Sequence, residues 1–141
     1  MNIKIKYHTK FDKPIQVIEN GDWIDLKAAK DYKYHAGEFF LIDLGVSMEL
    51  PKGYEALLAP RSSTFKKYKV IQTNGLAIID NSFCGTHDVW KMPVYALGNG
   101  EIHKNDRVAQ FRIIKNQPVI KFEEVDSLNN KERGGFGSTG R

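Results

Sequence analysis

Apolar residues recur at every second position in several short stretches of the chain. Residues 3–7 alternate isoleucine and tyrosine with lysine, and residues 42–50 place an apolar side chain at each even position. A period of two is typical of a β-strand that buries one face and exposes the other. Both stretches are therefore predicted to be strands.

Turn-forming residues separate further stretches of this kind. Residues 90–96 repeat the alternation and are followed by Gly98-Asn99-Gly100, which predicts a hairpin. Pro51-Lys52-Gly53 predicts another turn, and residues 108–114 and 119–122 are apolar enough for two short strands. Many short strands are therefore expected along the chain.

Helical periodicity is confined to one short segment. Residues 64–69 are expected to form a helical turn, for which Ser62 or Ser63 is the candidate N-cap. Short strands without long helices favour an all-β sandwich or barrel. Because the composition then changes, we expect one β domain over residues 1–126 and a flexible, glycine-rich arm over residues 127–141.

Bulk composition limits the classes of protein to be considered. With 141 residues and 41% hydrophobic content, the chain is suited to a single core. Its formal charge is only +4 and its basic residues are scattered, which does not favour nucleic-acid binding. Cys84 is the only cysteine, and no apolar run has the length of a signal peptide or a membrane span. A cytoplasmic protein without membrane or nucleic-acid partners is therefore expected.

Pro60-Arg61-Ser62-Ser63 combines the groups that bind a small anion. A guanidinium, two hydroxyls and the free amides of a starting helix can converge on one phosphate. The same four residues also fit a simpler structure, a serine-capped helix with a surface arginine. Both interpretations stay open from these residues alone.

A second candidate phosphate site lies near the C-terminus, in residues 133–140. Its glycines let backbone amides approach phosphate oxygens, and Ser138 and Thr139 add hydroxyl donors. Phe136 has no use in a flexible linker, whereas a lid that stacks on a nucleobase would use the ring. The alternative is a disordered tail in which the phenylalanine has no function.

Asp80 is the candidate general base. It ends an apolar stretch, and a carboxylate there can be held against a water molecule and remove its proton as the water attacks phosphorus. Asp80-Asn81-Ser82 is also a good turn sequence, so a structural role is the alternative. Asp25 and Gln110 are further polar candidates, although each, taken singly, is more simply explained as a surface residue.

Two common types of site are not supported by the spacing of residues. Cys84 and His87 have a spacing that could begin a zinc site, but no second cysteine is present to complete it. The chain also lacks the P-loop and the dinucleotide-binding glycine motif. Any nucleotide must therefore bind by another architecture.

Five segments resemble, in order, the five motifs of the trimeric dUTPase family. They are Asp25-Leu26-Lys27-Ala28, Pro60-Arg61-Ser62-Ser63, residues 74–85, Arg107-Val108-Ala109-Gln110 and residues 133–140. The resemblance implies a subunit with an antiparallel jelly-roll or distorted β-barrel fold. It also implies a homotrimer whose three active sites lie between subunits, each built from all three chains and closed by a mobile C-terminal arm.

The resemblance implies a role for each motif. Asp80 would contact the sugar and orient the attacking water, while Arg61 and Gln110 would hold the phosphates. Mg²⁺, the implied cofactor, would be held by the substrate phosphates and water, with Asp25 touching it only through water. The implied substrate-binding residues are Ser62, Ser63, Asn74, Gly75, Ile79, Phe83, Arg133, Phe136, Gly137, Ser138 and Thr139.

The nucleoside and the phosphates would be held by different segments. Residues 74–83 are implied to form a hairpin that receives deoxyuridine, with Phe83 against the deoxyribose. Phe136 would stack on uracil, and the rest of the arm would wrap the β and γ phosphates. Three positions depart from the family pattern: Phe83 stands where tyrosine is usual, Cys84 where the residue is commonly polar, and Trp23-Ile24 where small residues precede the first aspartate.

The implied activity is hydrolysis of dUTP to dUMP and pyrophosphate. This reaction limits uracil incorporation into DNA and supplies dUMP for thymidylate synthesis. The nearest alternative is a dCTP deaminase of the same fold, although such enzymes need a glutamate beside the base, where this chain offers Asp80. A trimeric nucleotide-binding regulatory module is the other alternative.

Overall fold

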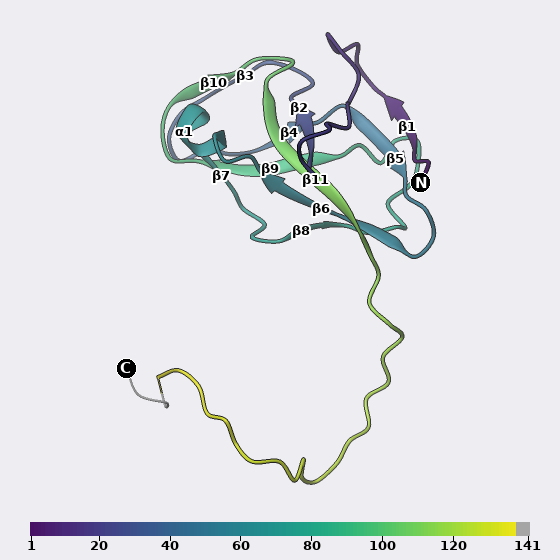
Figure 1. The fold of residues 1–141 in the computed structure, drawn as a ribbon. Coiled ribbons are helices and arrows are strands. Elements are labelled where there is room, and N and C mark those ends of the chain that lie inside the picture. Colours follow the sequence, from purple (N-terminus) through teal and green to yellow (C-terminus); the bar gives the residue numbers. More distant parts are fainter. Residues whose placement is uncertain (138–141) are drawn as a thin grey trace.

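The computed structural model describes residues 1–137 and consists of short strands with one helical turn (Figure 1). The all-β fold class is therefore confirmed. The elements are β1 (Lys4–Tyr7), β2 (Ile24–Lys27), β3 (Tyr32–Tyr34), β4 (Phe39–Asp43), β5 (Val46–Glu49), β6 (Tyr54–Pro60), α1 (Thr64–Tyr68), β7 (Val70–Gln72), β8 (Ala77–Ile79), β9 (Lys91–Ala96), β10 (Gly100–Ile102) and β11 (Arg107–Lys115).

Two sheets supply the core. Strands β2, β11, β6 and β8 lie in that order in a four-stranded sheet, and β4, β9 and β7 form a three-stranded sheet. Two ribbons, β1 with β5 and β10 with β3, complete the body, and all these pairings are antiparallel. Apolar side chains of both sheets meet in one buried cluster, where the rings of Trp90 and Phe111 pack edge-on with centroids 5.2 Å apart.

The single strand expected over residues 42–50 is two strands. Its alternation is confirmed, since all five even-numbered side chains are buried. The strand nevertheless breaks after β4, and β5 begins only at Val46. Gly45 lies in the gap with a φ of +67°, and a Cβ there would come within 2.9 Å of the Phe11 ring. The break thus depends on glycine.

The hairpin predicted at Gly98-Asn99-Gly100 is wrong. Strand β9 ends in the three-stranded sheet, and β10, which follows the turn, pairs with β3 instead. Gly100 lies close to Tyr34, whose hydroxyl would be 2.8 Å from an added Cβ. The turn residues indicate correctly that the chain changes direction here, but they carry no information about which strand β10 pairs with.

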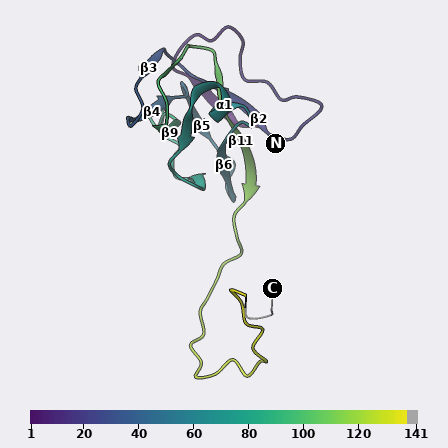
Figure 2. The ribbon, with the colours of Figure 1, turned by 90° about the vertical axis from the view of Figure 1, so that its left-hand side faces the viewer.

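The strand predicted over residues 119–122 has no partner within residues 1–137. After Lys115 the chain leaves the body as an irregular segment, which reverses direction partway along without rejoining the body by residue 137 (Figures 1 and 2). Val119 is 94% exposed and Phe122 96%. A strand needs a neighbour to satisfy its backbone groups, and one subunit supplies none here. The remaining predicted strands, over residues 3–7, 90–96 and 108–114, are confirmed as β1, β9 and β11.

The remaining local predictions hold. The helical turn is confirmed as α1, and Pro51-Lys52-Gly53 forms the turn between β5 and β6. In that turn the Tyr54 amide donates to the Pro51 carbonyl at 3.2 Å, and Gly53 has a φ of +86°. Among residues 1–137, no helix has the length and apolar character that crossing a membrane requires.

Candidate active site

Four predicted or neighbouring polar residues meet at one end of the four-stranded sheet. The register of β11 places Gln110 opposite Asp25 on β2 and opposite Ala59 on β6, one residue before the end of β6. Arg61 Nε lies 3.0 Å from Asp25 Oδ1, and Arg107 Nη1 lies 3.5 Å from Asp25 Oδ2. Gln110 donates to the Pro60 carbonyl at 3.0 Å. We call Asp25, Arg61, Arg107 and Gln110 the arginine cluster.

The two serines beside Arg61 do not cap the helix with their side chains. Ser63 occupies the N-cap position without a side-chain hydrogen bond to the helix. Thr64 fixes this end instead, because its hydroxyl accepts from the Arg61 amide at 2.9 Å and donates to the Val108 carbonyl at 2.9 Å. Thr64 is only 1% exposed. The expected N-cap residue is thus confirmed as Ser63, but without the side-chain hydrogen bond of a serine cap, and the hydroxyls of Ser62 and Ser63 are available to a ligand.

Asp80 follows β8, which lies at the edge of the four-stranded sheet. Its carboxylate accepts hydrogen bonds from the Ser82 hydroxyl and, at 2.9 Å, from the Ser82 amide. Its carbonyl accepts from the Phe83 amide at 3.0 Å, so residues 80–83 form a compact turn, which we call the Asp80 turn. The Ser82 hydroxyl, followed by the Ser82 amide, lowers the pKa of Asp80 from its ordinary 3.8. The turn-forming interpretation of Asp80 is thus correct, and it leaves the residue exposed and ionised.

A cavity of about 560 Å³ opens beside the Asp80 turn, within the size range of about 300–1,000 Å³ of small-molecule sites. Phe83, which is 41% exposed, and Ile79 line it together with Trp90 and Lys91. The Trp90 indole nitrogen is buried without a hydrogen-bond partner in the described chain. The cavity therefore offers apolar walls, the carboxylates of Asp80 and Asp88, and the amine of Lys91.

The segment before Asp80 is not the hairpin that the family resemblance implied. Strand β7 pairs with β9 in one sheet, whereas β8 pairs with β6 in the other. Between them, the Asn74 carbonyl accepts from the Gln72 side chain at 2.9 Å, and Gly75 has open space around it. As an edge strand, β8 keeps a row of backbone groups without a partner in its sheet.

The Asp80 turn and the arginine cluster lie at opposite ends of β6. Ile79 pairs with Ala56, and five extended residues lead from Ala56 to Arg61. At about 3.3 Å per residue, and with Asp80 one residue further away, roughly 20 Å separates Asp80 from Arg61. A single subunit does not bring the predicted base and the predicted phosphate ligands together.

The arm residues lie apart from both groups. Arg133, Phe136 and Gly137 are in the segment that leaves the body, and the Phe136 side chain is fully exposed. Ser138 and Thr139, also predicted to bind substrate, lie outside the described residues. The described part of the arm thus makes no binding site within its own subunit.

The side chains around Asp25 suit a magnesium ion whose ligands are mostly substrate phosphates and water. Among residues 1–137, no three His, Cys, Asp or Glu side chains gather closely enough to hold a metal. Both oxygens of Asp25 already face guanidinium groups. Mg²⁺ keeps several waters and commonly binds through substrate phosphates and few carboxylates. Asp25 is therefore suited to an outer contact through water.

Sequence patterns did not identify Arg107 as a member of the arginine cluster, and they did not identify the neighbouring loop between β1 and β2 as part of a cavity. Arg107 stands in the fourth motif beside Gln110. Asp12, Lys13 and Lys27 line a cavity next to Asp25. Lys27 belongs to the first motif, whereas Asp12 and Lys13 lie in an irregular segment without a motif, so no sequence signal marks those two.

Comparison with known proteins identifies close relatives along the whole chain. A protein-family model described as dUTPase matches residues 23–140. The chain is 53% identical over 140 residues to the SPbeta prophage-derived deoxyuridine 5'-triphosphate nucleotidohydrolase YosS of Bacillus subtilis, with 99% of each protein covered. It is 33% identical to the deoxyuridine 5'-triphosphate nucleotidohydrolase of Clostridium acetobutylicum, over 99% of this chain and 97% of that protein.

Solved structures share the fold. The dUTPase of Staphylococcus bacteriophage 80alpha with dUPNHPP matches with a TM-score of 0.76 at 21% identity, over 99% of both chains. The dUTPase of Streptococcus mutans matches with a TM-score of 0.73 at 17% identity, over 83% of this chain and 98% of that one. At these identities the likeness establishes the fold, an antiparallel jelly roll.

Proposed function

This chain belongs to the dUTPase family, and we propose that it hydrolyses dUTP to dUMP and pyrophosphate at sites shared between the subunits of a homotrimer. The observation that supports sharing is the distance of roughly 20 Å between Asp80 and Arg61 in one subunit. The groups around one α-phosphate cannot be that far apart. When a neighbouring subunit places its arginine cluster beside the Asp80 turn, both groups can surround the same α-phosphate.

In the proposed reaction, Asp80 orients a water molecule whose oxygen attacks the α-phosphorus. A new P–O bond forms as the bond from the α-phosphorus to the bridging oxygen breaks, and pyrophosphate leaves with that electron pair. Asp80 accepts the proton of the water. Its lowered pKa keeps it ionised at neutral pH, in the form that can accept a proton.

The arginine cluster is proposed to hold the phosphates. Arg61 and Gln110 supply donors from side chains that the sheet and Asp25 already orient. Ser62 and Ser63 add hydroxyls that the helix does not use. Donors fixed in advance stabilise developing negative charge without a cost of reorganisation during the reaction.

The nucleoside is proposed to occupy the cavity beside the Asp80 turn. The free edge of β8 offers backbone groups for the uracil ring, with Ile79 as an apolar wall. Phe83 would pack on the deoxyribose, and the absence of Cβ at Gly75 leaves room for close approach of Asn74 and its neighbours to the base.

Magnesium is proposed as the cofactor. When bound, it would neutralise part of the charge on the phosphates. Asp25 would meet it through water, because both carboxylate oxygens of Asp25 are engaged by arginines. The chain's own contribution is then to orient the triphosphate rather than to build a metal cage.

The C-terminal arm is proposed to close a site on another subunit. Residues 127–141 would act as this flexible arm, and residues 1–126 as the jelly-roll domain. Phe136 would stack on uracil, and its full exposure in one subunit leaves the ring free to do so. Arg133 and Gly137, with Ser138 and Thr139, would surround the β and γ phosphates.

The cell compartment and biological role follow from the same proposal. The only cysteine, Cys84, is exposed and unpaired, which suits the reducing cytoplasm. There, removal of dUTP would limit uracil in DNA and provide dUMP for thymidylate synthesis.

One assay tests the proposed reaction. Purified protein with Mg²⁺ is given each deoxynucleoside triphosphate, and release of pyrophosphate and of ammonia is measured. We expect pyrophosphate from dUTP in large preference to the other nucleotides. Ammonia from dCTP would instead identify a deaminase, and no product from any nucleotide would support a regulatory module; either outcome contradicts the proposal.

A further inference from the structure

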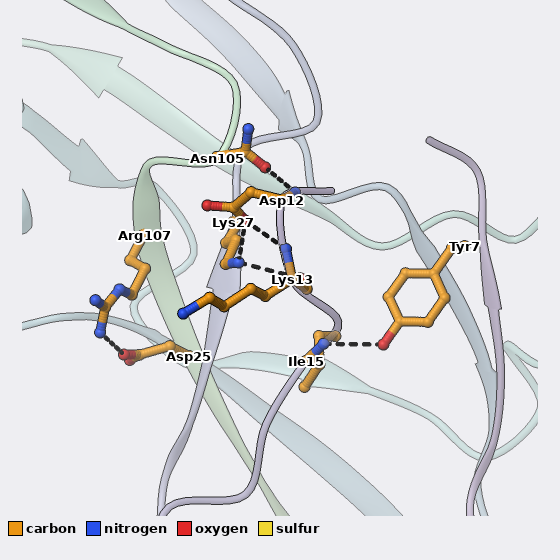
Figure 3. Close-up of polar contacts among 8 residues, drawn as sticks. All are labelled: Tyr7, Asp12, Lys13, Ile15, Asp25, Lys27, Asn105 and Arg107. Carbon is orange, nitrogen blue, oxygen red and sulfur yellow. Dashed lines mark hydrogen bonds and ion pairs between the residues drawn. The ribbon is translucent and has the colours of Figure 1, made fainter. Parts of the chain in front are cut away.

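A second cavity, of about 270 Å³, adjoins the arginine cluster. Its walls come from the loop between β1 and β2 on one side and from β2 and the start of β11 on the other. Asp25 and Arg107 belong both to this cavity and to the arginine cluster (Figure 3). A ligand group in the cavity would therefore be next to the groups proposed to hold the phosphates.

The loop that forms one wall is fixed by hydrogen bonds. The Asp12 amide donates to the Asn105 side chain at 3.0 Å, and the Ile15 amide donates to the Tyr7 hydroxyl at 2.9 Å. Between these points, the Lys13 carbonyl accepts from the Lys27 amine at 3.1 Å (Figure 3). The backbone of Lys13 is thus held in place, and its long side chain alone is free to move.

The charges around the cavity do not balance. Lys27 is neutralised by Asp12, 2.6 Å away, and its hydrogen bond is the main cause of a lowered pKa at Asp12. Asp25 is shared by Arg61 and Arg107. Within residues 1–137 the Lys13 amine has no ion-pair partner, and in Figure 3 its side chain extends toward Arg107 and Asp25. Three cations that line the cavity, Lys13, Lys27 and Arg107, therefore face two carboxylates, Asp12 and Asp25. Arg61, which also binds Asp25, lies outside the lining.

An excess of positive charge beside a phosphate site attracts the product with the higher negative charge. Of the two products of dUTP hydrolysis, pyrophosphate carries charge on both phosphorus centres and no apolar part. The lining of the cavity is mostly charged or polar near Asp25 and Arg107, which suits this anion and not a nucleobase.

We propose that this cavity is a subsite for the departing pyrophosphate and that Lys13 is its anion-binding side chain. Because the subsite takes a product of the proposed reaction, the inference rests on the proposed function. Lys13 binds the terminal phosphate and receives pyrophosphate when its bond to the α-phosphorus has broken. Lys13 is a product-binding residue and takes no part in proton transfer.

Direct calorimetric titration with magnesium pyrophosphate tests the subsite without any turnover. The variant Lys13→Gln keeps the backbone hydrogen bonds and removes the charge, so we expect pyrophosphate to bind about five- to tenfold more weakly. Lys13→Arg keeps the charge and should bind within about twofold of the wild type. Binding of dUMP, titrated in the same way, should be unchanged in both variants.

Lys10→Gln is the matched control. Lys10 is exposed on the same loop but does not line the cavity, so its loss changes the net charge equally without touching the subsite. Equal weakening in Lys10→Gln and Lys13→Gln, or unchanged pyrophosphate binding in Lys13→Gln, would overturn the subsite. If the wild type fails to hydrolyse dUTP, the proposed function falls instead, and the titrations still report whether Lys13 binds the anion.

Discussion

The arginine cluster and the Asp80 turn lie at the two ends of β6 and are held by different kinds of contact. Arg61 is fixed by Asp25, which is distant in sequence, and by the nearby Thr64 hydroxyl, which is itself held by the distant Val108 carbonyl. Asp80 is held by close neighbours in sequence: its carboxylate accepts from Ser82 and its carbonyl from the Phe83 amide. The fold of one subunit thus assembles the arginine cluster through long-range contacts, whereas local contacts alone shape the Asp80 turn and leave Asp80 exposed.

The largest effect is expected at Asp80. Asp80→Asn keeps the shape and one acceptor oxygen but removes the base, so turnover of dUTP should fall by about 10²- to 10⁴-fold while binding of dUTP persists. Steady-state kinetics and calorimetry with a non-hydrolysable analogue measure the two quantities. Turnover near the wild-type rate would show that Asp80 is only a turn residue.

Removal of the arm comes next. Truncation after Lys131 deletes Arg133, Phe136 and the residues beyond them. Those deleted residues that the structure describes, up to Gly137, do not pack on the body. We expect an unchanged melting temperature and oligomeric state, with turnover reduced by about 100-fold. The full-length Phe136→Ala variant serves as a control for the stacking ring. An unfolded truncated protein would mean that the arm belongs to the core.

A mixing experiment tests directly whether Asp80 and Arg61 act from different subunits. Asp80→Asn and Arg61→Ala chains, each nearly inactive alone, are unfolded together in equal amounts and allowed to reassemble. If the two groups act from different subunits, about a quarter of all sites in the randomly reassembled trimers contain neither substitution, and activity returns in that proportion. Recovery of no activity from well-folded mixtures would place both groups in one subunit's site.

The smallest effect is expected at Ser82. Its hydroxyl is the main cause of the lowered pKa of Asp80, so Ser82→Ala should raise that pKa toward the ordinary 3.8. A base works in its ionised form, so activity is lost as pH falls through this pKa. The acidic limb of the kcat/KM profile should therefore move to higher pH, with less than about twofold change at pH 7. An unmoved limb would show that another group controls it.

Sequence patterns correctly predicted those features of the fold that depend on residues close together in the chain. The alternation over residues 42–50 and 90–96 identified buried faces correctly, because the period of a strand is a local property. The meeting of Asp25, Arg61 and Gln110 followed from family resemblance and is present in the fold. The three-residue strands β3 and β10 were missed because so few positions establish no period.

The features that the sequence did not predict depend on tertiary contacts. Ser63 occupies the N-cap position of α1, as expected, but makes no capping hydrogen bond with its side chain. This end of the helix is held instead by the Thr64 hydroxyl, which donates to the Val108 carbonyl 44 positions away. The turn at residues 98–100 gave no indication that β10 would pair with β3. The distance between Asp80 and Arg61 likewise follows from strand register alone, and no motif records it.

The order of strands in the main sheet has a consequence for synthesis of the chain on the ribosome. Strand β11 lies between β2 and β6, yet it is the last strand of the body to be made. Until residue 115 has emerged, β2 lacks its only neighbour in that sheet and the sheet is split. Non-local pairing of this kind slows folding. The nascent protein must therefore remain soluble with an incomplete sheet through most of translation.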